Sequence, residues 1–283
     1  MNAVIITYNL GNTYIFDINT FLNKHFEFID LDLIVINLQE ANDIGFVQGN
    51  IRYKYVKKFQ MGQIQTVILS KYDLNPTVTE IGLGPLYFIN KGFLIINFKD
   101  LMIVNLHLYP HRHNYKRRQK ALDHLISILN NFKGLIILAG DFNFRNHIDE
   151  AQEFLEKYTD YKEMPITFKE TYKYNRIGFN RKRKPAYCDR ILINDSFNFA
   201  KPEKYGSFNE EIISDHKPVF LKLKIDLMVF QNDNENNELN TSVSETYCTG
   251  FYTLIYDHFL LFLICILAIL VLLIFVRFIR KVK

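Results

Sequence analysis

Residues 134–145 have the sequence GLIILAGDFNFR, and the fold is organised around them. The apolar run 135–138 predicts a buried strand that ends at the following Ala-Gly pair. Asp141, Asn143 and Arg145 then occupy alternate positions, and alternate side chains of an extended chain lie on one side. An anion, an amide and a cation on one side suit metal-assisted phosphoryl transfer. Taken alone, these residues are explained equally well by a Gly-Asp turn.

Polar side chains follow several other predicted strands at the point where each strand ends. Buried strands are predicted over residues 3–8 and 33–38, and residues 93–98 and 101–106 predict a hairpin. The polar residues at or beside the predicted strand ends are Asn9, Glu40, His107, Asp141 with Asn143, Asp189, and Asp215 with His216. The local sequence around Glu40 allows two interpretations. Glu40 could be a ligand of a hard cation, or its charge could stabilise the N-terminus of a helix.

The order of strands and helices favours an α/β fold with two packed, mixed β-sheets flanked by helices. Helices are predicted over residues 17–28, 115–132 and 149–158, and residues 52–70 predict two antiparallel strands. Hairpins interrupt the alternation, so a doubly wound parallel sheet is excluded. Two packed sheets would bring the polar strand ends to one rim. Acids and histidines there, without a nucleotide-binding glycine loop, suit Mg²⁺-dependent hydrolysis of a phosphate ester.

Residues 167–184 form a basic segment, TFKETYKYNRIGFNRKRK, without apolar periodicity. A solvated loop is the simple interpretation of such a segment. The alternative is a site for a polyanion, because clustered cations repel one another unless an anion offsets their charge.

Composition and the C-terminal segment predict a membrane-anchored protein in a reducing compartment. The chain has 283 residues, a net charge of +4 and three widely separated cysteines. Its N-terminus shows no secretory signal. A polar linker is predicted over residues 226–250, a transmembrane helix over 251–276 and a short basic tail over 277–283. This order predicts a C-terminal tail anchor with the preceding domain in the cytosol, although the basic tail conflicts with the positive-inside rule. A buried core helix is the alternative to the membrane span.

The motifs TYN, LQE, NLH, GDFN, CDRIL and SDH occur in the order found in the endonuclease/exonuclease/phosphatase superfamily, which this chain resembles over residues 3–225. GDFNFR and PAYCDRIL resemble the two signature motifs of inositol polyphosphate 5-phosphatases. The resemblance implies a four-layer α/β/β/α catalytic domain over residues 1–225. The chain departs from the family's motifs in two ways. It has no tryptophan, and Tyr8, Leu138 and Tyr187 stand where the family has one. Its basic loop is also shorter than in the family.

The resemblance also implies roles for individual residues. Glu40, helped by Asn9, would hold Mg²⁺, and Asp141 beside Asn143 would orient or deprotonate the attacking water. His216, oriented by Asp189, and His107 would contact the scissile phosphate, and Asp215 would help to place the metal or the water. The residues implied in substrate binding are Tyr172, Lys173, Arg181, Arg183, Lys91 and Arg190, of which Arg190 has a structural role as its alternative.

We therefore expect a Mg²⁺-dependent phosphoinositide 5-phosphatase that acts on the 4,5-bisphosphate or the 3,4,5-trisphosphate lipid at a cytosolic membrane surface. The expected partners are the lipid substrate and the membrane; no nucleic acid is expected, and the protein is expected to be monomeric. A short span with a basic tail favours the endoplasmic reticulum or another endomembrane. The alternatives are a phosphodiesterase or nuclease of the same superfamily, or a non-catalytic phosphoinositide-binding tether.

Overall fold

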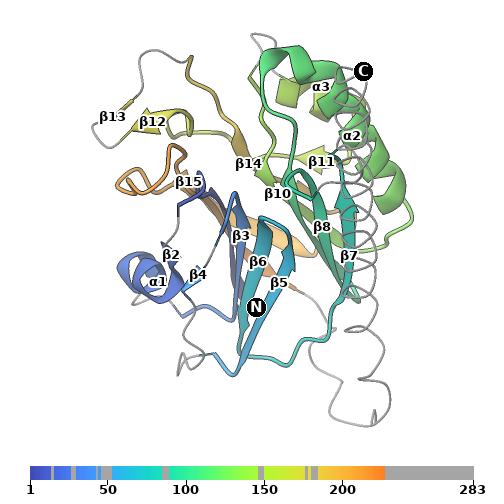
Figure 1. The fold of residues 1–283 in the computed structure, drawn as a ribbon. Coiled ribbons are helices and arrows are strands. Elements are labelled where there is room, and N and C mark those ends of the chain that lie inside the picture. The colour runs from blue at the N-terminus through green and yellow to red at the C-terminus, as the bar shows by residue number, and fades with distance from the viewer. Residues whose placement is uncertain are drawn as a thin grey trace, which may run out of the picture. The chain divides into compact units, whose positions relative to one another are not determined.

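A computed structural model gives the fold, and it describes residues 1–13, 16–26, 30–42, 44–45, 53–84, 89–145, 150–175, 178–179 and 184–226 (Figure 1). The chain divides into two units, Met1–Gln231 and Asn232–Lys283. All described residues belong to the first unit. Apart from Asp226, the predicted linker, membrane span and tail lie outside the described residues. Among the described residues, no helix has the length and apolar character needed to cross a membrane.

The first sheet has six strands, and β1 and β3 lie near its centre. Their order is β15 (Ala200–Ser207), β16 (Val219–Ile225), β1 (Asn2–Asn9), β3 (Leu33–Gln39), β6 (Ile64–Ser70) and β5 (Tyr55–Met61). Strands β1 and β3 run parallel, and the other neighbours run antiparallel. The sheet is therefore mixed, as predicted.

The second sheet is also six-stranded and mixed. Its order is β11 (Tyr161–Lys162), β14 (Asp189–Asn194), β10 (Leu135–Asp141), β9 (Leu101–His107), β8 (Gly92–Phe98) and β7 (Thr77–Gly82). Only β9 and β10 run parallel. Two short ribbons pair β2 (Phe16–Asp17) with β4 (Ile44–Gly45) and β12 (Tyr174–Asn175) with β13 (Gly178–Phe179).

The helices pack outside the two sheets. Helix α1 (Ile18–Phe26) shares a buried cluster with β1, β3 and β6. Helices α2 (Tyr115–Leu129), which follows the 3₁₀ turn η2 (Arg112–Asn114), and α3 (Glu150–Lys157) share a second cluster with β8, β9 and β10. A third cluster lies between the sheets. The predicted pair of packed, mixed sheets is confirmed.

The face between the sheets changes from apolar to polar along each central strand. On β1 the inward positions are Ala3 and Ile5, followed by Thr7 and Asn9. Strand β9 repeats this pattern and ends in His107. Since side chains alternate along a strand, one period-2 pattern supplies both the core and the polar rim.

Two edge strands, β7 and β15, were not predicted from the sequence. Most of their residues are exposed or half-buried, as expected for strands that pair on one side only. They therefore lack the apolar run that marks a buried strand.

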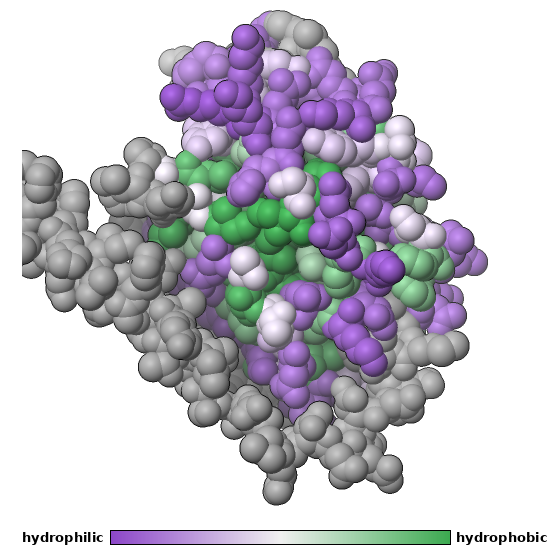
Figure 2. Space-filling model, turned by 90° about the vertical axis from the view of Figure 1, so that its right-hand side faces the viewer, coloured by the Kyte–Doolittle hydropathy of each residue, from purple (hydrophilic) through white to green (hydrophobic). Residues whose placement is uncertain are grey.

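Figure 2 shows one face of the molecule, on which hydrophobic residues gather in the middle and hydrophilic residues surround them.

Candidate active site

One row of paired residues across the second sheet brings three predicted site residues together. Asp141 on β10 is in register with His107 on β9 and with Asp189 on β14. Gly140, directly before Asp141, permits the close approach of β9, because a Cβ at this position would lie 2.0 Å from the carbonyl oxygen of Leu106. The sequence motif thus places a carboxylate at the centre of the row.

Asp141 is buried and both of its carboxylate oxygens accept hydrogen bonds. The side-chain nitrogen of Asn9, on the first sheet, donates to Oδ2 at 2.9 Å, and the backbone N–H of Asn143 donates to Oδ1 at 2.8 Å. Burial raises the pKa of Asp141, while the charge of His216 opposes this shift. The side-chain oxygen of Asn143 is buried and has no hydrogen-bond partner among the described residues.

Glu40, His107 and Lys91 form a charged group beside Asp141. Nε2 of His107 lies 3.6 Å from Oε1 of Glu40 and 3.5 Å from Oδ2 of Asp141, and Nζ of Lys91 lies 3.5 Å from Glu40 and also contacts the His107 ring. Burial and the neighbouring Lys91 charge hold the pKa of His107 well below its usual range. Burial also lowers the pKa of Lys91. Glu40 has a left-handed backbone (φ 49°), which turns it out of β3 towards this group.

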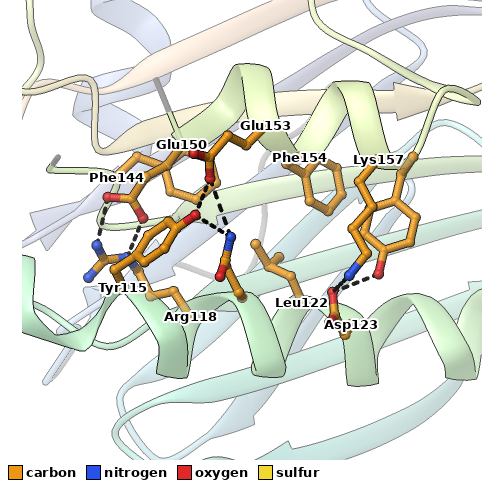
Figure 3. Close-up of a pocket in the computed structure, with 11 residues that line it drawn as sticks. Tyr115, Arg118, Leu122, Asp123, Phe144, Glu150, Glu153, Phe154 and Lys157 are labelled. Carbon is orange, nitrogen blue, oxygen red and sulfur yellow. Dashed lines mark hydrogen bonds and ion pairs between the residues drawn. The ribbon is translucent and has the colours of Figure 1, made fainter. Parts of the chain in front are cut away.

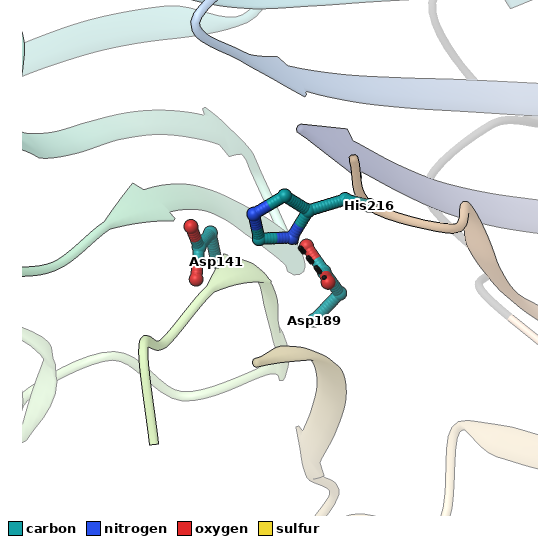
Figure 4. A group of neighbouring side chains, drawn as sticks. All are labelled: Asp141, Asp189 and His216. Carbon is teal, nitrogen blue, oxygen red and sulfur yellow. Dashed lines mark hydrogen bonds and ion pairs between the residues drawn. The ribbon is translucent and has the colours of Figure 1, made fainter. Parts of the chain in front are cut away.

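His216 and Asp189 form the opposite wall of the site (Figure 4). Nδ1 of His216 lies 2.8 Å from Oδ2 of Asp189, and the hydroxyl of Thr171 donates to the same oxygen at 2.6 Å. Burial alone would lower the pKa of His216, but the charge of Asp189 and its hydrogen bond raise it to about 9. The imidazole therefore carries a positive charge at neutral pH.

Tyr172, Lys173 and Arg145 lie next to His216. The Tyr172 ring centre is 4.7 Å from that of His216, and the Arg145 guanidinium is 4.0 Å above the Tyr172 ring. Nζ of Lys173 donates to Asp215 at 2.6 Å. Burial would raise the pKa of Asp215, but the charges of His216 and Lys173 lower it.

Arg145 was not among the predicted site residues, although the alternate spacing within GDFNFR was a signal for it. Its Nε is buried and donates to no acceptor among the described residues. The sequence predicted only that Arg145 lies on the same side of the chain as Asp141. The structure shows in addition that its cation lies beside Tyr172.

The structure does not bring Arg190 to this group. The Arg190 side chain lies on the opposite face of β14 from Asp189, where Nη1 lies 2.7 Å from Oε2 of Glu163 and Nε donates to the carbonyl oxygen of Tyr187. These contacts favour its structural alternative. The predicted substrate residues Arg181 and Arg183 lie outside the described residues.

The oxygen donors of the site fit a hard divalent cation. Asp141 and Asp189 offer carboxylate oxygens within 4.8 Å of each other, and Glu40 adds a carboxylate that is 28% exposed. A ring nitrogen of His216 lies within the same distance, but a positively charged imidazole has no lone pair for a metal. Oδ1 of Asp189 is buried without a hydrogen-bond partner in the described part of the chain. The amide oxygen of Asn9 already accepts from the backbone N–H of Gly11 at 2.9 Å, so only one of its lone pairs is left for a metal.

A cavity of about 100 Å³ lies between α2 and α3, and Arg118 and Glu150 lie on its wall (Figure 3). Arg118 is fully buried and donates two hydrogen bonds to Glu150, at 2.8 and 2.7 Å. Oε1 of Glu150 also accepts from the backbone N–H of Arg145 at 3.0 Å. This buried ion pair therefore supports the segment that carries Asp141 and Arg145.

Comparison with known sequences connects the chain to phosphatases. The family model described as Endonuclease/Exonuclease/phosphatase family 2 matches residues 146–222. The chain is 28% identical to type IV inositol polyphosphate 5-phosphatase 11 of Arabidopsis thaliana over 76% of this chain and 80% of the relative. It is 25% identical to inositol polyphosphate 5-phosphatase K of Mus musculus over 77% of this chain and 64% of the relative. The chain thus spans less than two thirds of that relative's length.

Solved structures with the same fold include proteins of different function. The inositol polyphosphate 5-phosphatase domain of SPsynaptojanin, in complex with inositol (1,4)-bisphosphate and calcium ion, matches with a TM-score of 0.60 and 20% identity over 80% of this chain and 85% of that chain. D. rerio TDP2 complexed with single strand DNA product has a TM-score of 0.58 at 15% identity, over 79% and 99% of the two chains. Cimex nitrophorin in its ferrous NO complex also matches, with a TM-score of 0.55 at 15% identity over 80% and 99%. The fold alone therefore does not determine the activity.

The family model, the curated relatives and the shared fold agree with the motifs: the chain resembles proteins of the endonuclease/exonuclease/phosphatase family and shares their fold. The predicted resemblance to inositol polyphosphate 5-phosphatases is confirmed by the curated relatives, two of which carry that name.

Proposed function

We propose that this protein is a Mg²⁺-dependent phosphatase that removes the 5-phosphate from phosphoinositides at a cytosolic membrane surface. The observation that carries the proposal is the position of Tyr172 and Lys173 against His216 and Asp215. This arrangement puts an aromatic ring and a cation beside the hydrolytic group, where a second phosphate of the substrate could bind. The 5-phosphatase relatives support the choice of substrate class.

The site residues divide into groups that act on water, on phosphate and on a metal. Asp141, fixed by Asn9 and Asn143, would orient the attacking water and accept its proton. His216, oriented by Asp189, would place its positive charge on the scissile phosphate. A divalent cation held by Glu40, assisted by Asn9, would polarise the phosphate oxygens when bound.

His107 and Lys91 would contact the same phosphate from the other side. His107 is neutral at neutral pH, so it can donate one hydrogen bond to a phosphate oxygen without adding charge. Lys91 remains close to both Glu40 and His107 and would offset the charge of an incoming anion. Arg145 stands beside Tyr172 as a further cation for the substrate. Water attack at the phosphorus atom would need no covalent intermediate.

The preference for a lipid substrate rests on the predicted C-terminal anchor. An anchor at residues 251–276 would hold the catalytic unit at a membrane surface and raise its effective concentration towards lipid headgroups. An endomembrane such as the endoplasmic reticulum is the proposed location, and a monomer the proposed state.

Phosphate release from a panel of inositides by the full chain in detergent tests the proposal. We expect release with Mg²⁺ from the 4,5-bisphosphate and 3,4,5-trisphosphate lipids, and none with a chelator or in Asp141→Asn. Cleavage of DNA with an abasic site instead would favour a nuclease of the same fold. Binding of inositides without any hydrolysis by the wild-type protein would favour a non-catalytic tether.

A further inference from the structure

A layer of buried polar side chains joins the two sheets directly beneath the candidate site. Its members come from β1, β3, β6 and β9 and are fully buried: Thr7, Asn37, Gln39, Thr66 and Asn105. Farther from the site, the same inward faces of these strands carry apolar side chains. Apolar contact is non-directional, whereas hydrogen bonds between buried polar groups specify one arrangement.

Gln39 and Asn105 form a side-chain hydrogen bond that crosses from one sheet to the other. Nε2 of Gln39 on β3 donates to Oδ1 of Asn105 on β9 at 2.7 Å. Nδ2 of Asn105 donates to the carbonyl oxygen of Gln65 at 2.8 Å and to Oγ1 of Thr66 at 3.1 Å, both on β6. These partners of Asn105 all belong to the first sheet, although β9 belongs to the second.

The bridge lies one step below the place where the two halves of the site meet. Gln39 directly precedes Glu40, and Asn105 lies two residues before His107 on the same face of β9. At the rim above them, Nε2 of His107 lies 3.6 Å from Oε1 of Glu40. On the opposite face of β6 from Thr66, Nε2 of Gln65 donates to the carbonyl oxygen of Ala41 at 3.0 Å and so holds the residue after Glu40.

We propose that Gln39 and Asn105 are positioning residues of the site. Their hydrogen bond fixes Glu40, on the first sheet, against His107 and Asp141 on the second. A site divided between two sheets needs the sheets to be held in one relative position, because displacement of reacting groups by about 1 Å can cost roughly 100-fold in rate. The kinetic consequence of this proposal rests on the proposed phosphatase function, whereas its consequence for metal binding does not.

The test compares Gln39→Met and Asn105→Leu with the control Asn37→Leu in the full chain. Asn37 is buried at the same depth and bonds Thr66 within the first sheet, at 2.8 Å. We expect kcat to fall about 10- to 100-fold in the two test variants with KM changed less than about twofold. The control should have a lower melting temperature than the wild type, but its kcat should stay within about threefold of the wild-type value. An equal loss of kcat in the control would overturn the proposal.

A double variant separates positioning from stability. Gln39→Met combined with Asn105→Leu removes both ends of the bridge, so neither end faces the other's missing polar group, and only the remaining acceptors of Asn105, the carbonyl oxygen of Gln65 and Oγ1 of Thr66, lose a donor. We expect it to regain part of the melting temperature lost in the single variants while kcat stays low. Recovery of kcat along with stability would overturn the proposal.

Calorimetric titration with Mg²⁺ gives a readout that needs no catalysis. We expect both single test variants to bind Mg²⁺ more weakly than the wild type and the Asn37→Leu control to bind it as well as the wild type. If the wild-type protein releases no phosphate from any inositide, the proposed function fails while this comparison still stands. Unchanged Mg²⁺ affinity in both test variants would then overturn the positioning role.

Discussion

The side-chain nitrogen of Asn9 donates a 2.9 Å hydrogen bond to Oδ2 of Asp141, although β1 and β10 belong to different sheets. Asp141 is thereby held from three sides: by Asn9, by the backbone of Asn143, and by its register with His107 and Asp189. The candidate site is therefore a property of the packed pair of sheets, and neither sheet contains it alone.

Asp141→Asn should abolish activity without unfolding the protein. A base that orients and deprotonates water contributes about 100-fold or more to the rate, so phosphate release should fall at least that far. Burial raises the pKa of Asp141, which means that its charge costs stability, whereas the amide of Asn can accept only one of the two hydrogen bonds. These effects oppose each other, so the melting temperature should stay close to that of the wild type. Activity within tenfold of wild type would argue against this role. Asp123→Asn is the control and should remain active, because Asp123 bonds Lys157 and Tyr158 and has no contact with the candidate site.

Lys173→Met should weaken only those substrates that carry a 4-phosphate. A charge-assisted hydrogen bond is worth about 1.5–3 kcal/mol, so KM for the 4,5-bisphosphate should rise roughly 10- to 100-fold. A substrate with a 5-phosphate and no 4-phosphate should be hydrolysed as before. Lys169→Met, an exposed lysine in the same segment, serves as the control. Equal losses on both substrates would mean that Lys173 does not read the 4-phosphate.

Arg118→Met should be among the most destabilising single changes in the described part of the chain. It would leave Glu150 as a buried charge without its cation, and breaking a buried ion pair costs about 3–5 kcal/mol. Urea unfolding measures this loss directly. Replacing both partners, with Arg118→Met and Glu150→Leu, should recover much of it, and a double variant less stable than Arg118→Met would contradict the account.

Stability should decrease in acid partly through Glu211, which joins α1 to the segment before His216. Burial would raise the pKa of Glu211, but hydrogen bonds from Lys24 at 2.6 Å and with His25 at 2.8 Å hold it below the ordinary value of 4.5. A carboxylate with a lowered folded-state pKa stabilises the fold above its ordinary pKa and loses this contribution as the pH falls through the folded value.

Melting temperature measured at about pH 6 and at successive values below about pH 4.5 tests this linkage. The wild type should lose more stability over this range than Glu211→Gln, which has no charge to lose. Parallel decreases in the two proteins would show that Glu211 does not contribute.

The central strands and the rim residues could be predicted because one local pattern encodes both. Strand β10 is apolar up to Ala139 and ends at Asp141, as the apolar run 135–138 before GDFNFR indicated. The same holds for β1 with Asn9 and β9 with His107. The sequence could not give the Gln39–Asn105 bridge, because which buried polar groups face each other depends on how the two sheets pack.

Arg190 and Arg145 show the limit of motif spacing. Both follow a site aspartate within a motif, but Arg190 is the next residue along an extended strand and therefore points to the opposite face. Arg145 follows the left-handed Asn143 (φ 53°) and reaches Tyr172 instead. Alternation along the strand could have indicated the outcome for Arg190, whereas the contact of Arg145 with Tyr172 depends on local backbone geometry.

Identification of the product formed from phosphatidylinositol 4,5-bisphosphate by the full chain with Mg²⁺ tests the central claim most directly. The account predicts one product, phosphatidylinositol 4-phosphate, together with one equivalent of inorganic phosphate, and neither in Asp141→Asn. Formation of the 5-phosphate lipid, release of the intact headgroup from the lipid, or no reaction at all would contradict it.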